Sequence, residues 1–313
     1  MPEHGSDQGS GTGAEGVATL TVLDRDDDAR IDRELAGLDA LDLTDGDRRS
    51  NAARFWSAAW PKLAAVAIGL ALWQLVVLSG WRDETILPGP VKVLDRFWEF
   101  LRTGEFTNST ILQKTIQRAL TGYALAVAVG AVVGAAMSQI KVLRTAFASF
   151  ITGLQTMPSI VWFPAALVLF KVGEPAILFV VVIGAAPSIA NGLLAGTDQV
   201  PPLLVRAGKV LGARGITLYR EVILPASLPS FVSGLKQGWA FSWRSLMAGE
   251  LIGATNGAPG IGGFLDNQRT VSDYPGLYAT MILILLIGIG VDALFGVVER
   301  RMHKRRGLHD HAA

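Results

Sequence analysis

The sequence predicts an all-α integral membrane protein with about six transmembrane helices. Half of the 313 residues are hydrophobic and only 18% are charged, whereas an ordinary soluble domain has about 25% charged residues. The mean hydropathy is +0.38. Six long apolar segments each approach the roughly 20 residues that cross a bilayer. Basic residues gather in alternate loops between these segments, which is typical of a multi-pass membrane protein.

The six apolar segments follow one another from residue 60 onward. We expect the spans at residues 60–80, 119–138, 151–171, 176–196, 227–253 and 276–298. Trp60 and Trp81 flank the first span, where interfacial aromatic residues belong. Prolines interrupt the third span, and the fifth span carries charged residues. Gly130 and Gly134 on the second span are expected to allow close helix packing.

Polar segments lie at both ends of the predicted transmembrane domain, residues 51–306. Residues 1–50 contain thirteen acidic and five basic residues and no aromatic residue, so we expect a disordered acidic tail. Residues 307–313 form a second tail. The absence of cysteine excludes disulfides and thiolate metal sites. Three of the four histidines fall in the last eleven residues, and we therefore expect no metal.

The basic residues predict the orientation of the chain. Four groups, within residues 48–62, 141–144, 206–220 and 300–306, fall on one side of a six-span protein. The excess of Lys and Arg in cytoplasmic loops then places both termini in the cytoplasm of a cell with this protein in its inner membrane. The segment 87–118 alternates polar and apolar residues and is expected to form interfacial helices, although its bases would lie outside.

The loop between the fourth and fifth spans, residues 203–225, has helical periodicity of its own. Five apolar residues fall on one helical face, and two glycines follow them. A second, shorter apolar face ends at a proline. We therefore expect two short amphipathic helices joined by a glycine corner, a compact knob outside the membrane. The residues concerned are Leu203, Leu204, Ala207, Val210 and Leu211, then Gly212 and Gly215, then Ile216, Tyr219, Ile223 and Pro225.

This loop also carries a spaced motif. It reads Arg206-Ala207-Gly208, three residues, Gly212, nine residues, Val222, one residue, Leu224-Pro225. The motif resembles the cytoplasmic signature of ABC-importer permeases, which begins Glu-Ala-Ala. Arg206 and Gly208 depart from that pattern, so the contact of the family's acidic residue does not carry over to Arg206.

Other stretches extend the resemblance to residues 60–306. They resemble permeases for nitrate, sulfonate, taurine and related anions, among them the aliphatic sulfonate permease. The stretches are Leu87-Pro88-Gly89-Pro90, Met157-Pro158 with Trp162 and Pro164, Gly173-Glu174, and Gly257 to Gly262.

The resemblance implies a type I ABC-importer permease that takes up a small anion by alternating access. It implies two ATPase subunits that grip the knob, a solute-binding protein on the outer face and a second permease copy, commonly identical. ATP and Mg would belong to the ATPase, because this chain has no phosphate-cradling G-x-x-x-x-G-K-[ST] loop. The chain is then a transport subunit and not an enzyme, with lipid but no nucleic acid among its partners. The implied ATPase-coupling residues are Arg206, Ala207, Gly208, Gly212, Val222, Leu224 and Pro225.

Ionisable residues inside predicted spans are candidates for function, because they are costly in lipid. Arg244 fits an anionic substrate, since a guanidinium offers paired donors to sulfonate or carboxylate oxygens. Its alternatives are an ion pair with an acid of a neighbouring span and a side chain that snorkels outwards. Glu250 is expected near the outer end, in a structural ion pair or a gate contact. The candidate pathway residues are Arg244, Trp243 and Glu250, with Trp162, Gln155 and Ser159 around the proline breaks.

An ion-coupled secondary transporter acting without an ATPase is the alternative function. Such a transporter is expected to show paired inverted halves with broken helices, and no internal repeat is visible in this sequence. A secondary transporter also has no use for the two-helix knob. Co-purification with an ATPase separates the two hypotheses.

Overall fold

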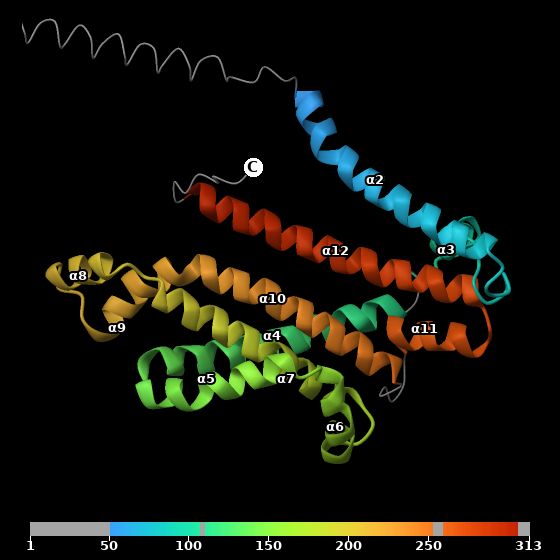
Figure 1. The fold of residues 1–313 in the computed structure, drawn as a ribbon. Coiled ribbons are helices and arrows are strands. Elements are labelled where there is room, and N and C mark those ends of the chain that lie inside the picture. The colour runs from blue at the N-terminus through green and yellow to red at the C-terminus, as the bar shows by residue number, and fades with distance from the viewer. Residues whose placement is uncertain (1–50, 107–109, 253–258, 306–313) are drawn as a thin grey trace, which may run out of the picture. The chain divides into compact units, whose positions relative to one another are not determined.

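The computed structural model describes residues 51–106, 110–252 and 259–305. The chain divides into two units, one ending at Ala71 and the other beginning at Leu72. Within the described residues every regular element is a helix (Figure 1). The tails expected at residues 1–50 and 307–313 lie outside the described residues.

The helices follow the predicted apolar segments, with short helices between them. The N-terminal elements are α2 (Asn51–Leu78), α3 (Pro90–Thr103), α4 (Thr110–Gln139), α5 (Lys141–Thr156), the 3₁₀ helix η1 (Ser159–Trp162), α6 (Phe163–Phe170) and α7 (Glu174–Asp198). The C-terminal elements are α8 (Pro202–Val210), α9 (Gly215–Leu218), the π-turn η2 (Tyr219–Ile223), α10 (Leu224–Leu251), α11 (Ile261–Thr270) and α12 (Tyr274–Arg305).

The described part of the first unit is the N-terminal portion of α2. Its apolar side chains point to all sides and are exposed, including Leu63, Val66 and Ile68. A helix that is apolar all round is typical of a membrane span.

Small residues bring the central helices of the second unit together. α7 packs against both α4 and α10. A Cβ atom on Gly192 of α7 would lie 2.5 Å from the Cα of Gly234 on α10, so neither position has room for a side chain. A Cβ atom added to Gly130 of α4 would likewise lie 2.7 Å from a carbonyl oxygen of α7, and one added to Gly134 would lie 2.8 Å from another. The packing role expected for these two glycines is confirmed.

Four helices in the described residues are long and apolar enough to cross a membrane. They are Ala59–Leu78, Thr110–Gln139, Glu174–Asp198 and Tyr274–Met302. The pair formed by α5 and η1–α6 makes a fifth if it is counted as one bent span. α10 has the length, at 28 residues, but it is too polar to be among them.

The third expected span, residues 151–171, is not one straight helix. The chain bends by 101° between α5 and the η1–α6 segment. Met157 at the break is extended, with ψ of 127°. Pro158 is the cause, because it lacks an N–H and disfavours helical geometry in the residue before it.

Candidate coupling knob and substrate pathway

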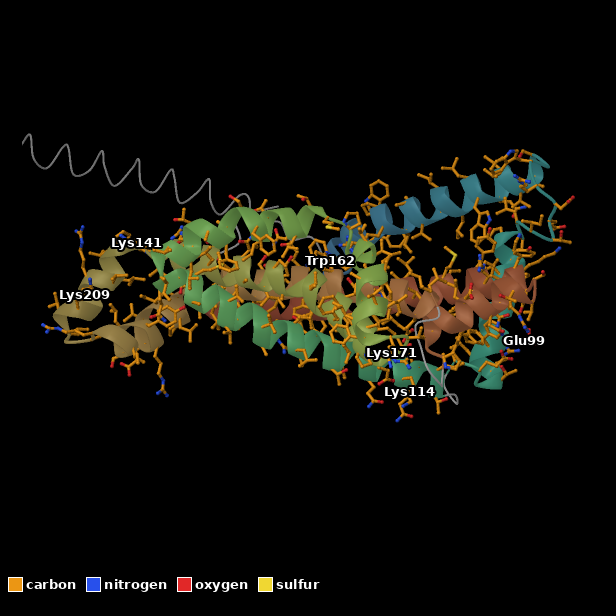
Figure 2. All side chains as sticks on the ribbon, turned by 90° about the horizontal axis from the view of Figure 1, so that it is seen from below. Glu99, Lys114, Lys141, Trp162, Lys171 and Lys209 are labelled. Atoms are coloured by element: carbon orange, nitrogen blue, oxygen red, sulfur yellow. The ribbon has the colours of Figure 1, made fainter. Side chains whose placement is uncertain are left out.

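α8, α9 and η2 form a knob, residues 202–223, at one end of α10, and α11 lies at the other end (Figure 1). Gly212 and Gly215 make the corner between α8 and α9, with φ of 91° and 53°. Glycine adopts this left-handed conformation without steric cost. The expected arrangement of two short helices joined by a glycine corner is therefore present. Lys209 lies on the knob, with Lys141 at the same end, whereas Lys114 and Lys171 lie towards the other end (Figure 2).

The inside of the knob explains one departure from the family motif. A Cβ atom on Gly208 would lie 2.9 Å from Val222 Cγ2 and 3.0 Å from Leu218 Cδ1. Glycine at this position lets α8 approach η2 closely. The Tyr219 hydroxyl lies 3.1 Å from Ser138 Oγ on α4, which ties the knob to the helix bundle.

Several large apolar side chains lie on the outer surface of the knob, beside exposed charged residues such as Arg206 and Lys209. Val210, Leu211 and Ile216 are each at least 85% exposed, and Leu203 is also exposed. Their apolar face therefore turns away from the chain, and the small Gly208 makes the inward contact. An exposed apolar surface of this kind indicates a site for another protein.

The knob continues directly into α10. The sequence suggested that Pro225 ends the second short helix, but η2 runs into α10 and Pro225 occupies the first turn of that helix. Proline is compatible with a first turn because the N–H there has no helical partner. A displacement of the knob therefore acts on α10 without an intervening loop.

α10 exposes a polar stripe, which we define as Ser230, Ser233, Gln237 and Arg244. Ser233, Gln237 and Arg244 are exposed and Ser230 is partly so. Their spacings of three, four and seven residues place them on one face of the helix. The other faces of α10 are largely buried, notably against α7. A polar stripe on a membrane helix is tolerated where it faces protein or a water-filled space.

A polar cavity of about 510 Å³ lies beside the first part of this stripe. Its walls come from α5, α7 and α10, and it contains Ser230, Ser233 and Gln237 of the stripe. Gln155 Oε1 accepts a bond from Asn191 Nδ2 at 3.3 Å, and Gln155 Nε2 donates to Ser188 Oγ at 3.5 Å. The expected pathway residue Gln155 thus belongs to a wall of amides and hydroxyls. The cavity is also lined by the carboxylate of Asp198, which pairs with Arg144 at 2.6 Å.

A second cavity, of about 620 Å³ and mostly apolar, lies between α10 and α12. Trp239 and Trp243 stack in its wall, with ring centroids 6.2 Å apart. Lys236 pairs with Asp292 at 3.2 Å. Asp292 was not singled out from the sequence, although a carboxylate inside the sixth expected span is itself a signal of function.

Arg244 reaches the same apolar cavity from the polar stripe. Its Nε donates to the Ala240 carbonyl at 3.1 Å, and its guanidinium lies 5.0 Å from the Phe241 ring centroid. No carboxylate of the described residues lies within ion-pair distance of Arg244. The two Nη atoms are therefore in a position to meet an anion.

The proline break of the third span lies against α10. Ser159 Oγ accepts a hydrogen bond from Ser245 Oγ at 2.7 Å. Trp162 ends η1 and is partly buried, and its Nε1 has no hydrogen-bond partner among the described residues.

Glu250 lies away from the polar stripe and is fully buried. It pairs with Arg118 of α4 at 3.1 Å. Arg118 was not singled out from the sequence, because it stands just before the apolar segment that marked the second span. The helix itself begins eight residues earlier, at Thr110.

Comparison with known proteins gives consistent matches. Residues 112–304 match the family model for the binding-protein-dependent transport system inner membrane component. A protein of Methanocaldococcus jannaschii named as an ABC transporter permease is 30% identical over 76% of this chain and 89% of its own length. The nitrate import permease NrtB of Synechococcus elongatus is 28% identical over 77% and 88%. A Bacillus subtilis protein named for aliphatic sulfonates transport, SsuC, is 26% identical over 80% and 90%.

The fold matches a solved transporter. A chain of the methionine ABC transporter MetNI, in an inward-facing conformation, superposes with a TM-score of 0.51. The match covers 61% of this chain and 93% of that chain, at 20% sequence identity.

Proposed function

Because this chain belongs to the family of binding-protein-dependent transport system inner membrane components, we propose that it is the permease subunit of an ATP-driven importer for a small anion. One observation carries the proposal: α10 joins the knob to both cavities. The helix begins at the end of η2 and contributes residues to the polar and the apolar cavity. A force applied to the knob therefore reaches the walls of the pathway.

The partner that moves the knob is a cytoplasmic ATPase, with two ATPase subunits in each complex. The exposed Val210, Leu211 and Ile216 supply an apolar surface for its groove. ATP and Mg bind to the ATPase, and closure of its two subunits displaces the knobs. The pore then shifts between inward-open and outward-open states, because ATP binds one state of the complex better than the other.

The substrate class follows from the named relatives and from Arg244. Relatives carry names for nitrate and aliphatic sulfonates, and both anions present oxygen atoms that a guanidinium can bind with paired donors. Amides and hydroxyls, among them Gln155 and Asn191, make up most of the polar lining of the cavity, and its carboxylate, Asp198, is paired with Arg144. The amides and hydroxyls can pass an anion onward without holding it as tightly as a cation would.

The orientation and the second copy follow from charge. Lys141 and Lys209 mark the knob end as cytoplasmic by the excess of basic residues there, and both termini are assigned to the same side. Lys236 and Asp292 form an ion pair between the middle parts of α10 and α12, and both side chains are partly exposed. Burial by a second copy of this chain removes such charges from lipid. The solute-binding protein docks at the opposite end, near α11.

Reconstitution of this chain with its ATPase and solute-binding protein tests the proposal. We expect ATP-dependent uptake of an anion, with ATP hydrolysis stimulated by the loaded binding protein. Candidate anions are first screened for binding to the solute-binding protein. Uptake by the purified chain alone, unaffected by ATP and driven by an ion gradient, would instead establish a secondary transporter.

A further inference from the structure

A buried carboxylate organises the end of the bundle opposite the knob. Glu250, at the end of α10, is fully buried. Its oxygens accept hydrogen bonds from Thr115 Oγ1 at 2.9–3.0 Å, Arg118 Nη1 at 3.1 Å and Gly262 N at 3.0 Å. A buried charge is stable only when it is paired and hydrogen-bonded in this way.

The turn at residues 259–262 packs closely against this carboxylate. Ile261 N donates to Thr115 Oγ1 at 2.8 Å. A Cβ atom on Gly260 would overlap the carboxylate of Glu250, and one on Gly262 would lie 2.7 Å from Glu250 Cβ. The turn can therefore approach Glu250 only because both positions are glycine.

Arg118 links the buried carboxylate to an exposed one. The Arg118 side chain is 4% exposed, and its Nε and Nη2 bind Glu174 Oε1 at 3.3 and 3.1 Å. Glu174 is the first residue of α7, and its side chain is 51% exposed. Arg118 thus joins α4, α7 and α10, with one arm buried and one arm in contact with solvent. The exposed arm is the weaker of the two.

We infer that Thr115, Arg118 and Glu250 are positioning residues that hold the 259–262 turn, and that the Arg118–Glu174 pair is a latch that opens when this end of the bundle opens. The inference rests on the proposed function, because it takes this end as the side from which solute enters. Opening breaks the exposed pair, while the buried pair keeps α4, α10 and the turn together.

Thiol labelling tests the positioning role. The natural chain has no cysteine, so Pro259→Cys supplies a single exposed reporter at the turn. In detergent-solubilised protein, Thr115→Val should make maleimide labelling at least fivefold faster. The hydroxyl both donates to Glu250 and accepts from Ile261 N, and the loss of one hydrogen bond alone corresponds to about fivefold. Thr115→Ser should restore the slow rate. Thr121→Val is the matched control, because Thr121 is exposed and its hydroxyl bonds only carbonyls of its own helix. An unchanged rate with Thr115→Val overturns the positioning role.

ATP hydrolysis by the complex, without binding protein or solute, tests the latch. Glu174→Gln keeps the shape of the side chain but removes the ion pair. It should raise hydrolysis about threefold, because a weaker latch favours the outward-open state that ATP stabilises. Glu84→Gln is the matched control, since Glu84 pairs with Lys92 at 2.8 Å on the surface.

The outcomes separate this inference from the proposed function. A wild-type complex without ATP-driven uptake contradicts the proposed function, and the labelling assay still reports on the turn. A normal wild-type complex whose Glu174→Gln variant hydrolyses ATP at the wild-type rate overturns the latch alone.

Discussion

At the scale of single residues, Arg244 is the strongest candidate for contact with the anion. Its Nε donates to the carbonyl of Ala240, which partly fixes the orientation of the guanidinium, and the residue lines the apolar cavity. A pre-oriented guanidinium loses less entropy when it binds an anion than a free one does.

Arg244→Ala should raise the apparent KM for anion uptake at least tenfold, because a hydrogen bond to a charged group contributes about 1.5–3 kcal/mol. Arg244→Lys should recover part of the loss, since it restores charge without paired donors. Arg102→Ala serves as the control, because Arg102 is also exposed and lies 5.5 Å from the ring centroid of an aromatic residue, Trp98. Wild-type uptake by Arg244→Ala in complexes of normal composition would remove Arg244 from the pathway.

The contact between Gly192 and Gly234 makes a second prediction at this scale. Gly234→Ala places a methyl group against the backbone of α7 and should destabilise the folded protein by about 1–3 kcal/mol, as overpacking does. Thermal unfolding in detergent measures the change. Gly290→Ala is the control within a span, because nothing lies within 4 Å of the added Cβ. A Tm equal to that of the control would show that the two helices separate without cost.

At the scale of elements, the knob presents Val210, Leu211 and Ile216 outward, whereas Gly208 and Leu218 face inward. The free knob therefore keeps an unfilled contact surface. Its direct continuation into α10 gives the transmission a rigid path, since a helix moves as a unit over a few turns.

Ile216→Asp should abolish co-purification of the ATPase while leaving the chain folded, because Ile216 is 85% exposed and a carboxylate there opposes burial in an apolar groove. Val91→Asp introduces the same charge at an exposed apolar position on α3 and is the control. Retention of the ATPase by the Ile216→Asp variant would place the coupling contact elsewhere on the knob.

The elements and the site differ in how far the sequence predicts them. The spans are predictable because a bilayer requires long apolar segments, and the glycine corner because few residues tolerate positive φ. The bend between α5 and η1–α6 is only partly predictable: prolines mark its place, but its angle of 101° has no local sequence signal, because α5, η1 and α6 pack against other helices. The pair formed by Arg118 and Glu250 joins residues 132 positions apart, and no local pattern reports such a contact. The polar cavity is likewise not predictable from local sequence, because its lining comes from three separate helices.

At the scale of the whole molecule, the basic residues of the loops predict which end is cytoplasmic. In the proposed function the knob end faces the ATP supply, and the end with α11 faces the source of solute. Single cysteines introduced into the natural chain test this directly. Thr270→Cys should react with an impermeant maleimide in intact cells, whereas Arg214→Cys should react only after the membrane is opened. The opposite pattern would reverse the orientation.

The exposed apolar surface of the knob also bears on how a cell keeps its subunits in proportion. In the proposed orientation, a copy that inserts into the membrane before it meets an ATPase exposes Val210, Leu211 and Ile216 to the cytoplasm. Chaperones and proteases bind such surfaces, so we expect an unassembled copy to be removed through the same residues that are proposed to contact the ATPase. Deletion of the ATPase gene should therefore shorten the lifetime of this protein in the cell. Assembly with the ATPase would cover this surface of the knob, and the assembled copy would then be protected from degradation.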